Sequence, residues 1–451
     1  MNKYTFYLLT IFITYSFCSE VCNDVAKNYQ LHLGTKTPYR IVANNTFGKI
    51  EYQGCKPNKM WMIIRHGTRN PSESFIESMD RRLPKIRDLI LKNNPTSSDV
   101  LHNSDLIALQ HWENKLKKKD QKKLTREGEN EMIDIAERMQ SRFPMLLSNI
   151  YSNTSYKFKH TDSQRTRKSA YYFSIGLFGK QIAKSVWYPE PSKKDPILRF
   201  YKLCSKWKKD VKENPESLLH RKEFEISPLM IKTIQEVNQR LKLSLNKLNF
   251  DDIYLMYSTC SYETAWKMNQ KSPWCSAFSL NDMKVLEYYE DLKYYWLDGY
   301  GYNLNHNQAC VVFDEIVSYF GSKNEYPKST IYFSHSGTLL KLLAHLQLYK
   351  EDKPLTRHNF NDKVDNRNFR VSRVSPFGTN LAMVLFDCGG VQKVLTLHQE
   401  HIIRLPSCPT TDLCEFNSIV DYYRSATSTC NFDEICGNKG ANETTDSTDD
   451  E

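Results

Sequence analysis

The chain has 451 residues, of which 40% are hydrophobic and 12% aromatic. This length and this apolar content exclude a wholly disordered chain and predict two or three domains with a sizeable core. The formal net charge of +10 favours an anionic partner, for which nucleic acid, anionic lipid and a polyphosphorylated small molecule are all candidates.

The N-terminus has the pattern of a secretory signal. Lys3 precedes an apolar stretch from Tyr4 to Phe17, which is shorter than the roughly 20 residues that a membrane-spanning helix needs. We expect a signal peptide over residues 1–19 and a secreted protein, with a signal anchor as the alternative. No later segment has the pattern of a transmembrane helix. Glycosylation sequons, which fit secretion, begin at Asn44, Asn153 and Asn442.

The cysteines also fit an oxidising compartment. One of the 12, Cys18, lies in the expected signal peptide, so an odd number remains and one should be free or intermolecular. The sequence contains no CxxC pair, so the cysteines do not favour a metal site. Three close pairs are candidates for small disulfide loops: Cys260/Cys275, Cys408/Cys414 and Cys430/Cys436.

The first clear structural signal is a short apolar run at residues 60–64, which ends at Arg65. Such a run is typical of a parallel strand buried on both faces, and the polar segment after it is then a strand-end loop. Helical spacing follows at residues 80–91. It recurs at 129–143, where the predicted helix is amphipathic and Pro144 ends it.

Two more strand–loop–helix units follow. Residues 156–160 alternate like a strand, and the loop from Thr161 to Arg165 leads into a helix with one apolar face. Residues 329–334 predict another buried strand, and the loop His335-Ser336-Gly337 precedes a leucine-rich helix.

The segment between these units differs in composition. Residues 200–325 are rich in charged and aromatic residues at helical spacing, which predicts a mostly helical insertion. Near the C-terminus, strands at 381–386 and 394–398 form a predicted hairpin that gives the sheet an antiparallel edge. An acidic tail, residues 437–451, is expected to be disordered.

These units predict an α/β fold, with a three-layer core, a mainly parallel sheet and a mostly helical inserted domain. The core is expected over residues 20–199 and 326–436, with the insertion at 200–325. Ligands of such sheets bind outside the carboxyl ends of the strands. Three separate segments then bring cationic groups to one edge, namely Arg65, His66, Arg69, Arg165 and His335.

This set of side chains suits phosphate-ester hydrolysis. A neutral imidazole can attack phosphorus to form a phosphohistidine, guanidinium groups match the phosphate oxygens, and the leaving alkoxide needs a proton. His66 is the candidate nucleophile, and Gly67 is interpreted as letting the backbone approach the phosphate. Taken singly, each of these residues also has an ordinary interpretation, as a solvated arginine or a helix-capping histidine.

The segment Arg65-His66-Gly67-Thr68-Arg69-Asn70-Pro71 after an apolar strand resembles the signature of the histidine acid phosphatases. Four further segments are similar to the multiple inositol polyphosphate phosphatases of that family, so the resemblance runs from about residue 55 to 436. The segments are Gln164-Arg165-Thr166 with Ser169, Ser272-Pro273-Trp274-Cys275, Lys284-Val285-Leu286-Glu287-Tyr288 and Gly299-Tyr300-Gly301-Tyr302.

The resemblance implies a two-step reaction through a phosphohistidine at His66, with His335 as the second catalytic residue. It implies substrates such as inositol hexakisphosphate and 2,3-bisphosphoglycerate, and neither a metal nor a cofactor. The phosphate-binding residues that it implies are Arg65, Arg69 and Arg165, together with His335. No nucleic-acid partner is expected, and the oligomeric state is left open.

One departure from the family pattern concerns the proton donor. The resemblance predicts a carboxylate directly after the second histidine or one residue further on, but Ser336 and Gly337 occupy these positions. Loss of a general acid costs roughly 10²–10⁴ in rate. Three alternatives stay open: a substitute acid such as Asp162 or Glu400, a slow enzyme selective for good leaving groups, or a protein that binds anions without turnover.

Two other clusters have more ordinary interpretations. The lysines at 115–123 are expected to form a solvated face, although a structural or nucleic-acid-binding role for them is a distant alternative. His398, Glu400 and His401 could suggest a metal site, but they lack the helical metalloprotease spacing and we interpret them as structural.

Overall fold

The computed structural model describes residues 29–96, 101–427 and 430–438. The predicted signal peptide, the sequon at Asn442 and nearly all of the predicted acidic tail lie outside these residues. No helix in the described part of the chain is long and apolar enough to cross a membrane.

A seven-stranded mixed sheet carries the predicted strand-end loops. Its strand order is β2-β3-β1-β4-β5-β6, and β7 also pairs with β5. The pairs β2–β3 and β3–β1 are parallel and the others antiparallel, so β1, β2, β3 and β5 all point the same way. The strands are β1 (Lys56–Arg65), β2 (Tyr156–His160), β3 (Ser329–Ser334), β4 (Asn380–Cys388), β5 (Val391–His398), β6 (His401–Ile403) and β7 (Leu413–Glu415).

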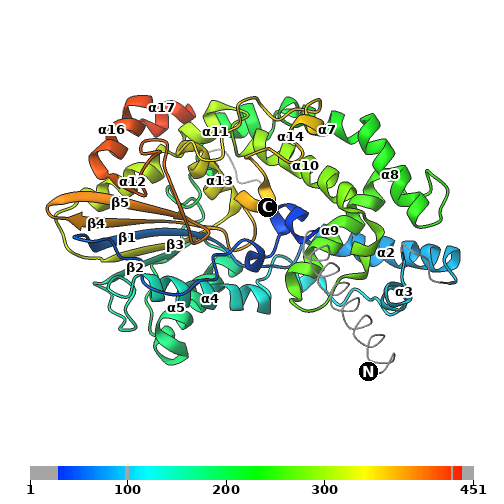
Figure 1. Cartoon of the computed structure of the whole chain (residues 1–451), viewed down its shortest axis with the longest axis horizontal. Coiled ribbons are helices and arrows are strands. Elements are labelled where there is room, and N and C mark those ends of the chain that lie inside the picture. The colour runs from blue at the N-terminus through cyan, green and yellow to red at the C-terminus, as the bar shows by residue number, and fades with distance from the viewer. Residues whose placement is uncertain (1–28, 97–100, 428–429, 439–451) are drawn as a thin grey trace, which may run out of the picture.

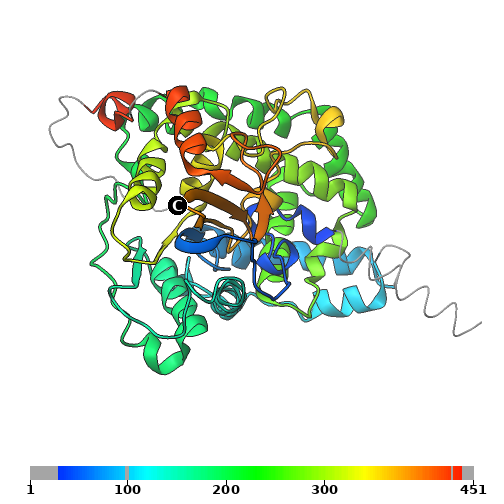
Figure 2. The ribbon, with the colours of Figure 1, turned by 60° about the vertical axis from the view of Figure 1, so that its left-hand side comes forward.

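The predicted α/β fold is confirmed, and the side chains of β1 explain its three layers. Met60, Met62 and Ile64 pack in the core with α4 (Arg126–Arg142) and α5 (Gln164–Ala183). Trp61 and Ile63 point to the other face, toward α12 (Cys310–Gly321), α13 (Ser336–His345) and α16 (Phe416–Thr427). Because both faces are covered, β1 needs apolar residues at consecutive positions (Figures 1 and 2).

The predicted hairpin is present as β4 and β5, and β4 lies antiparallel to β1 at the centre of the sheet. The helix expected at residues 80–91 begins earlier, since α2 covers Glu73–Asn93.

Residues 200–325 are mostly helical, and the helices between residues 219 and 297 lie toward the right of Figure 1, whereas α12 lies against the sheet on the left. Although α2 and α3 (Asn103–Gln110) precede this segment in the chain, α2 lies beside its helix α9, and Arg82 of α2 forms an ion pair with Asp252 of α9 at 2.5 Å. The main helices of the segment are α7 (Leu219–Glu225), α8 (Pro228–Arg240), α9 (Phe250–Trp266), α10 (Leu280–Leu297) and α11 (Asn303–Asn307).

Five disulfides join the described cysteines. Cys260–Cys275 and Cys408–Cys414 are the predicted small loops. The predicted pair Cys430/Cys436 is wrong, because these two cysteines bond to distant partners instead. The three long-range disulfides are Cys204–Cys436, Cys310–Cys430 and Cys55–Cys388.

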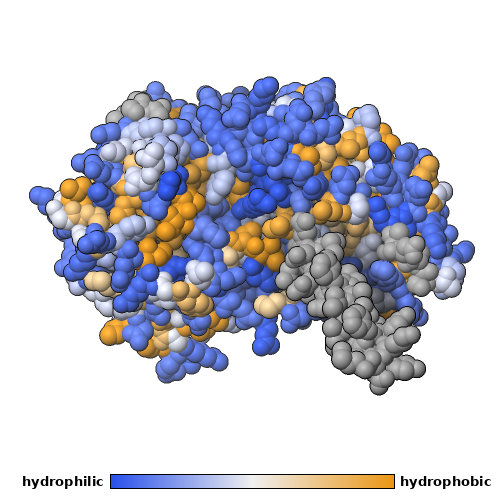
Figure 3. Space-filling model, viewed as in Figure 1, coloured by the Kyte–Doolittle hydropathy of each residue, from blue (hydrophilic) through white to orange (hydrophobic). Residues whose placement is uncertain are grey.

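On the face drawn in Figure 3, apolar residues appear as separate patches between broad hydrophilic areas. Scattered apolar groups of this kind are ordinary on a folded protein.

Candidate active site

The carboxyl ends of three parallel strands bring the predicted residues together. In the register of β1 and β3, Arg65 lies opposite Ser334, so that His66 and His335 follow side by side. The His66 amide donates to the carbonyl of Ser334 at 3.1 Å, and the amide of Thr161, after β2, donates to that of Phe333 at 3.2 Å. All five predicted site residues line one cavity of about 260 Å³.

His66 is held as a neutral imidazole with its proton on Nδ1. Its Nδ1 lies 2.9 Å from the carbonyl oxygen of Gly67, and because a carbonyl only accepts, Nδ1 carries the proton. The other ring nitrogen, Nε2, then keeps its lone pair. Burial and the nearby charges of Arg165, Arg65 and Arg69 lower the pKa of His66 well below its ordinary value. The ring therefore stays neutral at mildly acidic pH.

His335 lies next to His66, with ring centroids 5.7 Å apart. Its Nδ1 faces a guanidinium nitrogen of Arg165 at 3.4 Å, and its Nε2 lies 2.9 Å from Oγ1 of Thr161. Arg165 is the second residue of α5, whose N-terminus itself favours anions. Burial, followed by the charge of Arg165, lowers the pKa of His335 well below its ordinary value.

The arginines of the cavity have donors that the protein does not satisfy. Arg65 donates through Nη1 to the carbonyls of Thr35 and Ser375 and stacks on Phe377. Within the described residues, the buried Nε atoms of Arg65, Arg69 and Arg199 have no hydrogen-bond partner. Buried donors without partners cost free energy, and a bound oxyanion would satisfy them.

The loop after β1 is fixed by α4. Thr68 donates to the buried carboxylate of Glu131 through its amide at 2.7 Å and its hydroxyl at 2.8 Å. Burial raises the pKa of this carboxyl to about 7. A Cβ atom at Gly67 would lie only 2.5 Å from the carbonyl oxygen of Gly128, so the glycine is needed for close packing on α4. The structure thus explains Gly67 by this close backbone contact. From the sequence alone we expect a different reason, namely that the glycine lets the backbone approach a phosphate.

The cavity is more basic than the five predicted residues indicate. Arg199 lines it from the loop before the helical segment, and nothing in its local sequence pattern identifies it. Lys122 is the one lysine of the 115–123 cluster on the cavity wall, whereas Lys118 pairs with Glu77 at 2.5 Å on the surface. The lining cations are Lys36, Arg65, Arg69, Lys122, Arg165, Arg199, Lys212 and Lys293, against one carboxylate, Asp298.

The two substitute acids suggested by the sequence do not line this cavity. Asp162 is exposed and is not among the described residues that line the cavity. Glu400 is fully buried elsewhere, where it accepts from Arg138 at 2.7 Å, from Arg142 and from the hydroxyl of Tyr39. Glu400 as the substitute acid is therefore wrong, and its ion pairs make it structural.

The histidines near Glu400 also have protein partners. His398 contacts the hydroxyl of Tyr349 at 2.6 Å, and His401 contacts the carbonyl of Val42 at 3.0 Å. In the part of the chain that the structure describes, no group of three or more potential metal-ligating side chains comes together.

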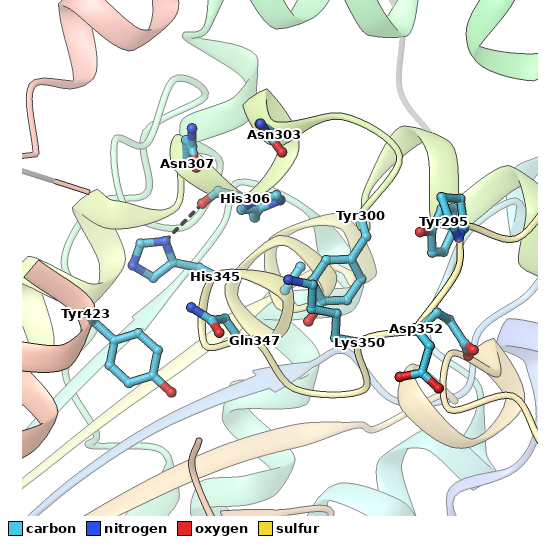
Figure 4. Close-up of a pocket in the computed structure, with 13 residues that line it drawn as sticks. Tyr295, Tyr300, Asn303, His306, Asn307, His345, Gln347, Lys350, Asp352 and Tyr423 are labelled. Carbon is cyan, nitrogen blue, oxygen red and sulfur yellow. Dashed lines mark hydrogen bonds between the residues drawn. The ribbon is translucent and has the colours of Figure 1, made fainter. Parts of the chain in front are cut away.

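A second cavity, of about 340 Å³, contains none of the predicted site residues (Figure 4). His345 and His306 face it, and Nδ1 of His345 donates to the carbonyl of His306 at 3.0 Å. One cation, Lys350, lines this cavity against two carboxylates, Glu351 and Asp352. The cation-rich cavity at His66 is therefore the better anion site.

Comparison with known proteins agrees with this geometry. Residues 58–405 match the histidine phosphatase superfamily (branch 2). The chain belongs to this family. It is 34% identical over 415 residues to multiple inositol polyphosphate phosphatase 1 of Drosophila melanogaster, covering 89% of this chain and 86% of that protein. The human protein of the same name is 29% identical over 460 residues, covering 95% and 93%. The chain is accordingly a phosphoric monoester hydrolase by family.

Solved structures show the same fold. The phytase from D. castellii superposes with a TM-score of 0.74 at 18% identity, covering 92% of this chain and 88% of that one. The multiple inositol polyphosphate phosphatase of Bifidobacterium longum, in complex with inositol hexasulfate, gives 0.66 at 13% identity, covering 89% and 99%.

Proposed function

We propose that the protein is a secreted phosphomonoesterase that hydrolyses inositol polyphosphates through a phosphohistidine at His66. In this proposal Arg65, Arg69, Arg165 and His335 hold the phosphoryl group that reacts. 2,3-bisphosphoglycerate is a second candidate substrate. The observation that carries the proposal is a neutral, buried imidazole facing a cavity with eight cationic side chains.

The charge of the cavity favours a substrate with several phosphates. A single phosphoryl group needs only the groups around His66, namely the arginines and His335. Four lysines, Lys36, Lys122, Lys212 and Lys293, line the wall in addition. Lys36 is already paired with Glu290 at 2.5 Å, so together the lysines add positive charge that would attract further phosphates on one ring, and salt would screen this attraction.

Several features support secretion. Five disulfides are typical of an oxidising compartment. The sequon residue Asn153 is exposed in the loop before β2, where a glycan could be attached. Relatives named multiple inositol polyphosphate phosphatase make the substrate class the simplest expectation for this chain.

The alternative is an anion-binding protein with weak or no turnover. It is favoured by one specific observation, the absence of a carboxylate at Ser336 and Gly337, where the family resemblance predicts the proton donor. Both functions use the same pocket, so they differ only in whether bound phosphate ester is hydrolysed.

A phosphate-release assay with inositol hexakisphosphate near pH 5 separates the two functions. We expect release by the wild type and none by His66→Ala. Arg69→Ala should lower kcat/KM by about 10- to 100-fold, because a charge-assisted hydrogen bond contributes roughly 1.5–3 kcal/mol. Lys350→Ala, in the second cavity, is the matched control and should leave the rate unchanged.

Calorimetric titration of the same variants with inositol hexasulfate, which cannot transfer a phosphoryl group, tests the binder. Salt-sensitive binding that Arg69→Ala weakens, without phosphate release by the wild type, would establish the anion-binding alternative. If the protein neither binds inositol hexasulfate nor releases phosphate, both functions are refuted.

A further inference from the structure

The active-site cavity contains a carboxylate that the sequence pattern does not indicate. Asp298 follows the last residue of α10 as its C-cap, and its backbone amide donates to the carbonyl of Tyr294 at 2.9 Å. Among the described residues that line the cavity, it is the only acidic one. Its side chain is 14% exposed, so it lies at the cavity wall and not on the outer surface.

The position of this carboxylate relative to α13 is informative. A Cβ atom at Gly337 would lie 3.2 Å from Oδ1 of Asp298, closer than ordinary van der Waals contact. The space that a side chain at residue 337 would enter is therefore already occupied by a carboxylate oxygen. Residue 337 is one of the two positions at which the resemblance predicts a carboxylate, and here a carboxylate oxygen from the end of α10 lies 3.2 Å from the point where that side chain would begin.

Lys341 holds Asp298 in this position. It lies one turn after Gly337 on α13, its side chain is fully buried, and its ammonium is paired with Oδ1 of Asp298. The same ammonium donates to the carbonyl of Leu297 at 3.2 Å and stacks over Trp207 at 4.3 Å. A carboxylate fixed by a buried cation keeps one orientation toward the cavity.

We propose that Asp298 is the acid–base catalyst of the phosphatase reaction, in place of the carboxylate missing at residue 337. This inference rests on the proposed function. It deepens that function, because it names the residue that allows esters with poor leaving groups to be hydrolysed.

The proton balance of the two steps is complete when Asp298 enters the first step as the protonated carboxyl. In the first step, Nε2 of His66 bonds to phosphorus while the ester P–O bond breaks, and the Asp298 carboxyl gives its proton to the departing alkoxide. The product is a free alcohol, and the new carboxylate is stabilised by Lys341. In the second step, water attacks phosphorus, the carboxylate takes a proton from that water, and the P–N bond breaks to release phosphate.

The test compares two substrates that differ in their need for a proton. The leaving alkoxide of inositol hexakisphosphate must be protonated, whereas 4-nitrophenyl phosphate releases a stabilised phenolate. Asp298→Asn should lower the rate with inositol hexakisphosphate by about 10²–10⁴, the usual range for a general acid, and the rate with 4-nitrophenyl phosphate by less than about tenfold.

Asp162→Asn is the matched control, because Asp162 lies in the loop after β2 but outside the cavity wall. It should change neither rate. Since Asp298→Asn leaves the buried Lys341 without its ion partner, thermal unfolding is measured alongside. If that variant unfolds, Asp298→Asn/Lys341→Met removes both charges, and the same substrate-selective loss is expected.

A relocation variant gives the sharpest result. Asp298→Gly/Gly337→Glu moves the carboxylate from α10 to α13. With inositol hexakisphosphate, its rate should be at least tenfold higher than that of Asp298→Gly. Gly337→Glu alone should not increase the rate, because it crowds two carboxylates together.

Equal losses with both substrates, or no loss in Asp298→Asn, would overturn the role of Asp298 while the phosphatase function stands. Wild-type protein that releases no more phosphate than His66→Ala from either substrate would overturn the function as well.

Discussion

At the scale of single residues, the proposed chemistry depends on an imidazole that resists protonation. Burial comes first among the causes, and the positive charges around His66 act in the same direction. A histidine whose pKa is lowered in the folded protein stays neutral as the pH falls through the ordinary value near 6.5. His66, the proposed nucleophile, is thus available under acidic conditions in which a solvated histidine would be charged.

NMR titration of ring-labelled histidines checks this prediction. We expect the His66 signal, assigned by its loss in His66→Ala, to show no protonation step between pH 7 and about pH 5. Inorganic phosphate should move the titration upward, because a dianion favours the charged imidazolium. A midpoint near pH 6.5 in the ligand-free protein would contradict the lowered pKa of His66.

At the scale of elements, the position of His66, the proposed nucleophile, depends on the packing of the β1–α2 loop on α4. The two glycines at this contact have no room for a side chain, since Cβ atoms at Gly67 and Gly128 would lie 2.5 and 2.3 Å from backbone oxygens of the opposite segment. Backbone atoms cannot move aside as a flexible side chain can. The loop and the helix must therefore separate if either residue is enlarged.

Gly67→Ala and Gly128→Ala should each lower the free energy of unfolding by about 1–3 kcal/mol, the usual cost of overpacking, and should also reduce activity by displacing His66. Gly321→Ala at the end of α12 is the control, because its Cβ would be 4.0 Å from Phe416. Urea denaturation measures all three. A stability equal to wild type in Gly67→Ala would show that the contact can relax.

At the scale of the whole molecule, the C-terminal segment is tied to distant helices by disulfides. Cys310–Cys430 joins α12 to the segment before α17 (Phe432–Cys436) across 120 residues, and Cys204–Cys436 joins the start of the helical segment to α17 across 232. Such long loops restrict the unfolded chain more than a short loop does. The disulfide Cys408–Cys414 spans only 6 residues.

Replacing Cys310 and Cys430 by serine should therefore cost about 4–5 kcal/mol, compared with about 2 kcal/mol for the same change at Cys408 and Cys414. Chemical denaturation of the two double variants compares them directly. An equal loss in both would argue that the disulfides act through native contacts instead of the unfolded chain.

The sequence alone determined the local units and the core of the site. Apolar runs ending at Arg65 and Ser334, and the strand at 156–160, identify strands and the loops after them, because periodicity is a property of neighbouring residues. Parallel strands bring their carboxyl ends to one edge, so the convergence of His66, Arg165 and His335 in one cavity could be predicted.

Only the tertiary structure decided which residues complete that cavity. Arg199 lies in a loop and Asp298 at the C-terminal end of α10, and no motif in the sequence marks either residue. Glu400, which the sequence left open as a substitute acid, is buried in ion pairs with Arg138 and Arg142. The partners of Cys430 and Cys436 were likewise beyond local reasoning. The positions of these residues depend on which segments, distant in the sequence, come together in the folded protein. The spacing of residues along the chain does not determine these contacts; the packing of the helices on the sheet does.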